Sequence, residues 1–94
     1  MAIRITDVQT TTGQAIPNGG STDRRHLNFI GRVSPSGTVE IKDGRGGTVL
    51  GSAQAVEGEP FKVAVNNLEA KKYEFVAELQ GTSEHSGPWV ITVT

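Results

Sequence analysis

The chain has 94 residues, of which 35% are hydrophobic and 20% are charged, and its formal net charge is -1. This composition suits one folded domain; it is too polar for a membrane span and lacks the positive field that gathers nucleic acid. The sequence contains no cysteine, so disulfides, thiolate chemistry and cysteine-based zinc sites are excluded.

Glycine and proline separate short apolar runs throughout the chain, a pattern typical of an all-β domain. The first expected strand carries Ile3 and Ile5, with Val8 as a further candidate. Residues 9–23 are polar and rich in turn-forming residues. We therefore expect a long connection there, with a short edge strand near residues 14–16.

The middle of the chain predicts further strands, each bounded by a turn signal. In residues 26–33, alternate positions from Leu27 to Val33 are Leu, Phe, Gly and Val, which predicts a strand with one buried face. Residues 34–37 read Ser-Pro-Ser-Gly and fit a type I turn. After this turn, Val39 and Ile41 are expected to point inward from the next strand, and the chain should reverse at residues 43–47. Residues 48–55, which are mostly small, are expected to form an edge strand, and Phe61, Val63 and Val65 to point inward from the strand after it.

The best-patterned stretch is residues 73–79, where alternate positions are apolar and only Val76 breaks the alternation. It follows a corner at residues 66–71 that contains Leu68. A tyrosine at the start of a strand just after such a turn is typical of the tyrosine corner of immunoglobulin-type sandwiches. The hydroxyl of Tyr73 is therefore predicted to bond backbone near that turn.

A last strand at residues 89–94 sets Trp89 and Ile91 inward, after a polar loop at residues 81–88. Short strands with turn signals about 8 to 12 residues apart predict a β-sandwich. The count gives an all-β fold, a seven-stranded antiparallel immunoglobulin-like Greek-key sandwich, as a single domain over residues 1–94. Each strand crosses the domain from one pole to the other, so a chain of seven strands ends at the pole opposite to its start. The two chain ends should therefore lie at opposite poles of the domain.

Three stretches of the chain resemble the bacterial immunoglobulin-like repeats of large surface adhesins and biofilm proteins. The first, residues 26–44, contains a strand, a glycine, a turn and the run Thr38-Val39-Glu40-Ile41. The second, residues 48–53, reads TVLGSA and is similar to the TVLGTA strand of those repeats. The third, residues 68–77, is similar to L-x-x-G-x-Y-x-F-x-A, with Ala70-Lys71 where a glycine is usual. The resemblance extends from Ile5 to Val93. Members of this family often bind calcium between repeats through acidic loops, whereas here Glu84 is the one carboxylate of residues 81–88.

The resemblance implies a non-catalytic structural or adhesive module, a spacer or display domain of a bacterial surface or secreted protein. Its partners would be neighbouring immunoglobulin-like domains of the same longer chain, and it would be monomeric and extracellular or at the cell surface. Two alternatives stay open: a carbohydrate-binding accessory domain of an extracellular enzyme, and an immunoglobulin-like decoration domain of a phage or virion. Met1 leads directly into strand-like residues 2–5 without a signal peptide; this fits either a small intracellular protein or a module of a longer exported chain, and we favour the second.

No catalytic residue is predicted. The loop Ser83-Glu84-His85-Ser86 holds a nucleophile, an acid and a base, but sequence neighbours in one loop do not converge as a triad requires. The glycines of residues 44–51 are interpreted as a hairpin, because the lysine and the helix of a phosphate-binding loop are lacking.

No metal or cofactor site is predicted either. The two histidines, His26 and His85, are far apart in sequence, which disfavours a transition-metal site. A weak calcium site at one pole, using Asp7, Asp23 or Glu84, is the alternative.

Three further features are interpreted as structural or solvated. The basic cluster at residues 24–26 is expected to be solvated, with an acidic glycan or partner as the alternative. Trp89 is placed in the core by its parity, with an exposed sugar-stacking platform as the alternative. Glu74 and Glu78 are expected on a solvated sheet face.

Overall fold

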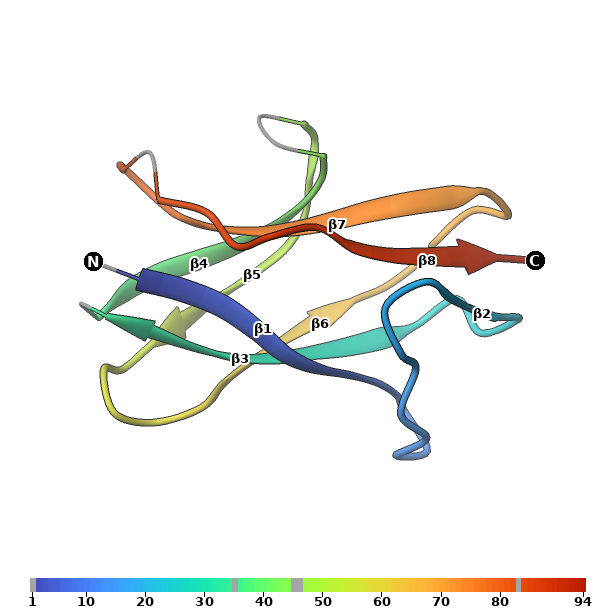
Figure 1. The fold of residues 1–94 in the computed structure, drawn as a ribbon, viewed down its shortest axis with the longest axis horizontal. Coiled ribbons are helices and arrows are strands. Elements are labelled where there is room, and N and C mark those ends of the chain that lie inside the picture. The colour runs from blue at the N-terminus through green and yellow to red at the C-terminus, as the bar shows by residue number, and fades with distance from the viewer. Residues whose placement is uncertain (1, 35, 45–46, 83) are drawn as a thin grey trace.

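The computed structural model describes residues 2–34, 36–44, 47–82 and 84–94. In these ranges the chain forms eight strands and no helix (Figure 1). The strands are β1 (Ala2–Thr10), β2 (Gly20–Thr22), β3 (Leu27–Ser34), β4 (Gly37–Asp43), β5 (Val49–Ala55), β6 (Phe61–Val65), β7 (Lys72–Leu79) and β8 (Trp89–Val93).

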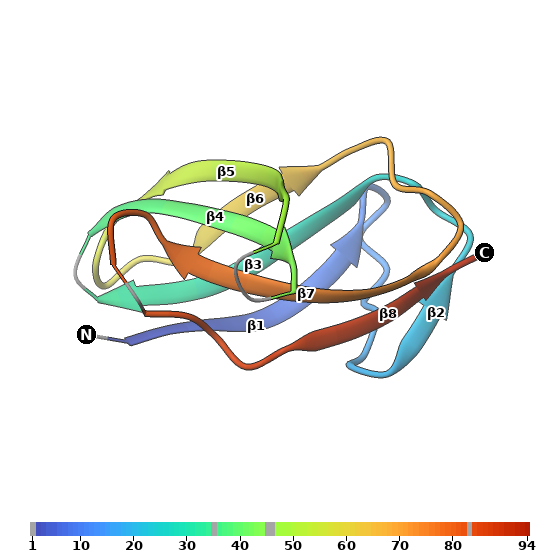
Figure 2. The same ribbon diagram turned by 90° about the horizontal axis from the view of Figure 1, so that it is seen from above.

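The strands form two sheets that pack face to face (Figures 1 and 2). One sheet has three strands in the order β1-β3-β6, and the other has five in the order β2-β8-β7-β4-β5. The chain therefore changes sheet at each connection from β1 to β4, again between β5 and β6, and once more between β6 and β7. The fold is an all-β sandwich, as the alternating sequence predicts.

The prediction of seven antiparallel strands is wrong at β2. This strand pairs in parallel with β8, with Gly20–Thr22 beside Ile91–Val93, so the five-stranded sheet is mixed and the described strands number eight. The edge strand expected near residues 14–16 is only a bridge between Gln9 and Ala15. A polar segment shows no alternation of its own, and its strand partner is supplied from the far end of the chain, so local pattern carried no signal for it.

The core lies between the two sheets and is centred on aromatic rings. The Phe29 and Phe75 ring centroids are 4.5 Å apart, and the Tyr73 ring stacks on Phe75 at 5.1 Å with an interplanar angle of 9°. The expected inward residues are confirmed as buried: Leu27, Phe29, Gly31, Val33, Val39, Ile41, Phe61, Val63, Val65, Tyr73, Phe75, Ala77, Leu79, Ile91 and Val93.

A bulge in β1 explains why residues of opposite parity both face the core. Ile3 and Val8 are both buried, although a regular strand would place them on opposite faces. The register with β3 shifts between Ile5 and Asp7, which inserts one residue and returns the following side chains to the other face. The candidate position Val8 is therefore confirmed in the first strand.

The molecule is elongated, with principal extents of 35 × 25 × 20 Å. β1 starts at one end of the long axis and β8 finishes at the other (Figure 1), so the expectation of chain ends at opposite poles is confirmed. β7 is the middle strand of its sheet. β5 lies at the edge, as expected for the small-residue strand. Within the described residues, no helix has the length and hydropathy needed to cross a bilayer.

Three sequence-based predictions include positions outside the described residues. The turn at residues 34–37 includes Pro35, the reversal at residues 43–47 includes Arg45 and Gly46, and the loop at residues 83–86 includes Ser83. The turn type at 34–37 stays a prediction.

Candidate functional sites on the sheet faces and at the poles

The corner before β7 is built around Tyr73. Its hydroxyl accepts a hydrogen bond from the Glu69 backbone N–H at 2.9 Å. Asn67 adopts a positive φ of 58°, a conformation that Asn tolerates better than most residues, and it turns the chain so that Leu68 is buried. The structural role predicted for Tyr73 is confirmed, because both its ring and its hydroxyl are used within the fold.

The basic cluster at residues 24–26 is divided by the fold. The Arg25 guanidinium donates to the Leu68 carbonyl at 3.0 Å, and the Leu68 N–H donates to the Arg25 carbonyl at 3.1 Å. Arg24 instead extends into solvent beside Asp23, with 3.9 Å between its Nε and Oδ1. Arg25 therefore joins the corner to the start of β3, and all three residues of the cluster are exposed, as predicted.

Asp43 connects the end of β4 to the start of β7. Its Oδ2 lies 2.7 Å from the Lys71 ammonium, and its Oδ1 accepts from the Glu74 N–H at 3.3 Å. The hydrogen bond to Asp43 raises the pKa of Lys71 above its ordinary value, since the charged ammonium gains a partner that the neutral amine would lose. Lys71 also lies over the Tyr73 ring, with its Nζ 4.6 Å from the centroid.

Trp89, which its parity placed in the core, packs against the core and is only partly buried, so the prediction is corrected to a position at the border of the core. Its ring packs against the core, and its indole N–H donates to the Ile16 carbonyl at 3.2 Å. Asn18 fixes the same segment, because its amide donates to the Pro88 carbonyl at 3.0 Å and accepts from the Val90 N–H at 2.8 Å. Trp89 stands at the start of β8, where its side chain packs against the core and stays partly exposed.

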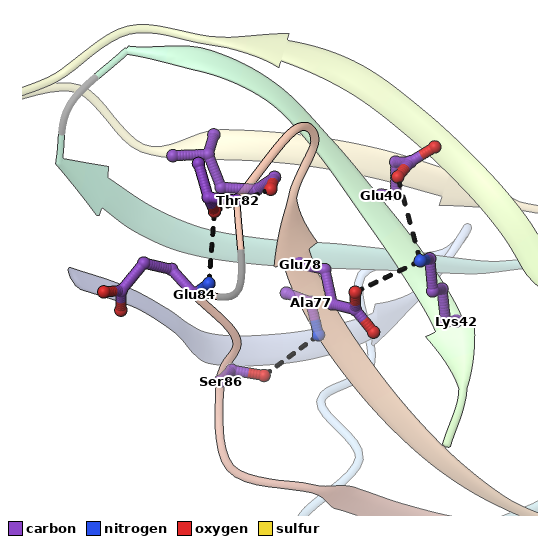
Figure 3. Close-up of polar contacts among 8 residues, drawn as sticks. Glu40, Lys42, Ala77, Glu78, Thr82, Glu84 and Ser86 are labelled. Atoms are coloured by element: carbon purple, nitrogen blue, oxygen red, sulfur yellow. Dashed lines mark hydrogen bonds and ion pairs between the residues drawn. The ribbon is translucent and has the colours of Figure 1, made fainter. Parts of the chain in front are cut away.

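The loop before β8 completes the edge of β7 in place of a strand (Figure 3). The ladder between β7 and β8 stops at Phe75 and Trp89. Beyond it, the Ser86 N–H donates to the Ala77 carbonyl at 2.8 Å, and the Ala77 N–H donates to the Ser86 Oγ at 3.0 Å. Ser86 is 3% exposed, so the prediction of a wholly solvated loop is wrong at this residue.

The His85 ring is not hydrogen-bonded to the hydroxyl of the neighbouring Ser86. His85 Nδ1 lies 3.0 Å from the backbone carbonyl oxygen of Ser86, whose own hydroxyl donates to the Gly87 carbonyl at 2.9 Å. The Glu84 N–H donates to the Thr82 hydroxyl at 3.1 Å. The His85 ring and the Ser86 hydroxyl are therefore both in contact with backbone carbonyl oxygens.

A charged cluster occupies the outer face of the five-stranded sheet (Figure 3). The Lys42 ammonium lies 3.1 Å from a Glu78 carboxylate oxygen and 4.0 Å from one of Glu40. The three side chains are only 15 to 18% exposed. The solvated face expected for Glu74 and Glu78 is therefore right for Glu74, which is exposed, and wrong for Glu78.

The candidate calcium ligands lie on separate elements. Asp7 is on β1 and accepts from the Gln9 side-chain amide at 2.7 Å, Asp23 follows β2, and Glu84 follows β7. Among the described residues, no group of three or more His, Asp or Glu side chains is placed to hold a metal ion. His26 precedes β3, whereas His85 forms an isolated antiparallel β-bridge with Glu78 of β7. The two histidines are therefore not brought together.

No protein-family model, no curated protein and no solved structure matches this chain. Its function is therefore inferred from the fold and from the surfaces described above.

Proposed function

We propose that this chain is a non-catalytic immunoglobulin-like module that spaces or displays neighbouring domains of a bacterial surface or secreted protein. The observation that carries the proposal is the placement of the chain ends at the two ends of a 35 Å long axis (Figure 1). A rigid body with this geometry can be joined end to end, and each added copy then lengthens the assembly.

The arrangement of the strands supports the immunoglobulin-like assignment. β1, β3 and β6 form one sheet, and β5, β4, β7 and β8 form a run of four neighbours in the other. A Greek-key sandwich is expected to have such a partition, with repeated crossings between sheets, so the strand order supports the proposal. The hydrogen bond from Glu69 to the Tyr73 hydroxyl is a second, independent feature of such sandwiches.

A scattering experiment tests the mechanical part of the proposal. Two and three copies joined end to end should increase the maximum dimension measured by small-angle X-ray scattering by about 35 Å for each copy, the long extent of one domain. A maximum dimension that hardly increases from one copy to three would contradict a spacer, because the copies would then be lying side by side.

The coding region around this segment tests the biological part. A long reading frame with similar repeats supports the spacer. A frame that starts at Met1 and stops after Thr94 removes it and favours the alternative of a small decoration domain on a particle surface.

A further inference from the structure

A turn at residues 17–20 leads the chain into β2 and is held against β8. The Gly20 N–H donates to the Pro17 carbonyl at 2.9 Å, and Gly19 has a positive φ of 88°. These are features of a type II turn, whose third residue takes a positive φ and is therefore most often glycine. The turn sets β2 beside β8 (Figure 1).

β8 binds this turn through three hydrogen bonds, two of which involve the backbone of Val90. The Asn18 amide oxygen accepts from the Val90 N–H at 2.8 Å, and the Asn18 amide nitrogen donates to the Pro88 carbonyl at 3.0 Å. The Gly19 N–H donates to the Val90 carbonyl at 2.7 Å. The groups bound in this way are the side-chain carbonyl, the side-chain nitrogen and the next backbone nitrogen, which are the groups that react when an asparagine deamidates.

We propose that Asn18 is a latent deamidation site, which is protected while β8 holds the turn and reacts when the turn opens. The Gly19 backbone nitrogen attacks the Cγ of Asn18, and the new N–C bond closes a succinimide ring. The Cγ–Nδ2 bond breaks and releases ammonia, which takes up the proton lost by the Gly19 nitrogen. Water then adds to either ring carbonyl and opens the ring to aspartate or isoaspartate. Water is the co-reactant, and no oxidant or reductant takes part.

The sequence selects Asn18 among the four asparagines of the chain. It is followed by glycine, whose missing Cβ lets the backbone nitrogen approach the Cγ, whereas Asn28, Asn66 and Asn67 are followed by larger residues. Asn18 and Gly19 are both exposed, and a Cβ added at Gly19 would meet nothing within 4 Å. Water therefore reaches the site, and its protection comes from the hydrogen bonds to β8.

These hydrogen bonds block the attack in two ways. The nucleophile is the deprotonated backbone nitrogen, and a hydrogen-bonded N–H gives up its proton only when that bond opens, as in amide hydrogen exchange. The bonds to Pro88 and Val90 also fix the side-chain amide against β8, so its Cγ is not free to rotate toward the Gly19 nitrogen. Opening is local, because β2 has three residues and is the edge strand of its sheet.

Deamidation prevents the turn from closing as before. Both products lack the amide N–H that donates to the Pro88 carbonyl, and they set a carboxylate oxygen beside it. Isoaspartate also lengthens the main chain by one carbon, which displaces the Gly19 N–H from the Val90 carbonyl. The segment before β2 is then held less tightly, and with it the Ile16 carbonyl that the Trp89 indole N–H binds. This one-way change goes beyond the spacer and does not depend on it.

Peptide mass spectrometry of the wild-type domain, kept at mildly alkaline pH, tests the proposal. In urea, the unfolded chain should convert Asn18 faster than Asn28, Asn66 or Asn67. In buffer, the folded domain should convert Asn18 at least about tenfold more slowly than the unfolded chain, because the reaction waits for the turn to open. Equal rates in the folded and unfolded chain, faster conversion of another asparagine, or no conversion at all in the folded domain would overturn the proposal.

Two variants that each remove one hydrogen bond between a side chain and the backbone distinguish local opening from global unfolding. Trp89→Phe removes the donor to the Ile16 carbonyl and should raise the rate at Asn18 in the folded domain about fivefold, as loss of one hydrogen bond predicts. Tyr73→Phe removes the acceptor of the Glu69 N–H at the corner before β7 and should leave the rate unchanged. Equal acceleration in the two variants would overturn local opening. In urea both should react as the wild-type chain does.

The fluorescence of Trp89, the single tryptophan of the chain, reports the consequence of the reaction. The deamidated domain gains a negative charge, so ion exchange separates it from the unmodified protein. Its emission should shift to longer wavelength, because the indole becomes more exposed to water. Asn18→Asp should show a smaller shift in the same direction, since its main chain is not lengthened. Unchanged emission in the separated deamidated protein would overturn the loosening of the segment before β2.

Discussion

β3 and β7 are the middle strands of the two sheets, and their outer faces differ. On β3 the outer face is open to water and carries Arg32 opposite Arg4, with no carboxylate in ion-pair contact within the described part of the chain. On β7 the outer face is exposed at Lys72 and Glu74. It is covered farther along the strand, where Val76 is 4% exposed and Glu78 is paired with Lys42. The two strands have equally regular inner faces, so the difference lies wholly on the outside.

This difference separates structure from function on the surface. The charges beside β7 satisfy one another and contribute to the fold, whereas the charges beside β3 act on whatever approaches from solvent. The substitutions below test this division in order of the effect expected on stability.

Gly31→Ala should have the largest effect. A Cβ at this position of β3 would lie 2.1 Å from the Arg4 carbonyl oxygen and 2.5 Å from the Phe61 ring, so backbone has to move. We expect a loss of about 3 kcal/mol in the free energy of unfolding, measured by chemical denaturation. Gly87→Ala is the control, because an added Cβ there meets nothing within 4 Å; equal midpoints for the two variants would contradict the close packing at β3.

Ser86→Ala should have the next largest effect, on the side of β7. It removes the oxygen that accepts from the Ala77 N–H and leaves that buried donor without its partner. We expect a loss of about 2 kcal/mol, the cost of an unsatisfied buried polar group. Ser52→Ala, on the exposed surface of β5, should change stability little. If Ser86→Ala behaves in the same way, the loop does not hold the edge of β7.

Tyr73→Phe keeps the ring stacked on Phe75 and removes only the hydroxyl that accepts from Glu69. We expect a loss of about 1 kcal/mol, a typical net contribution of one hydrogen bond. An unchanged denaturation midpoint would refute the corner. Glu69→Ala retains the backbone donor and should leave the midpoint close to that of the wild-type domain.

Lys42→Met tests the paired charges on the outer face of β7. We expect a loss of less than about 1 kcal/mol at low salt, as found for ion pairs near a surface, and a smaller loss at high salt because the attraction is screened. A double-mutant cycle with Glu78→Gln isolates the contribution of the pair. Lys72→Met, at an exposed position of β7, serves as the control, and a cycle with no coupling energy would remove the distinction between the two faces.

The smallest effect is a change in titration. Asp43 raises the pKa of Lys71 by hydrogen bonding, so the stability that this pair contributes is present at neutral pH and is lost as pH rises through the folded-state pKa, above 10.5. In Asp43→Asn, the Lys71 pKa measured by NMR should fall toward its ordinary value, whereas Asp23→Asn should not alter it. A Lys71 pKa that is the same with and without Asp43 would exclude this cause.

Much of the fold was readable from local sequence. Alternation in residues 27–33, 61–65 and 73–79 predicted strands and their buried faces, because side chains in a strand alternate between core and solvent. The Tyr73 corner was also predictable from local sequence, because its turn and its strand are neighbours in sequence. β2 was missed because Gly20–Thr22 carries no apolar alternation and pairs with a strand from the end of the chain.

The surface features depended on register, which no local pattern supplies. Arg4 and Arg32 were each recognisable as outward positions, but only the pairing of β1 with β3 places them opposite each other. In the same way, Ser86 looked like one more polar loop residue, but the ladder with β8 stops at Phe75 and leaves Ala77 without a β8 partner on that edge of β7.

The sequence by itself determined that this protein is an all-β sandwich with a defined core, because period-2 alternation and glycine-rich turns are local physical signals. Tertiary structure alone decided which charges meet and which stay open. Those outcomes arise where strands distant in sequence lie about 5 Å apart, and strand order and register, which set these meetings, are properties of the folded chain as a whole.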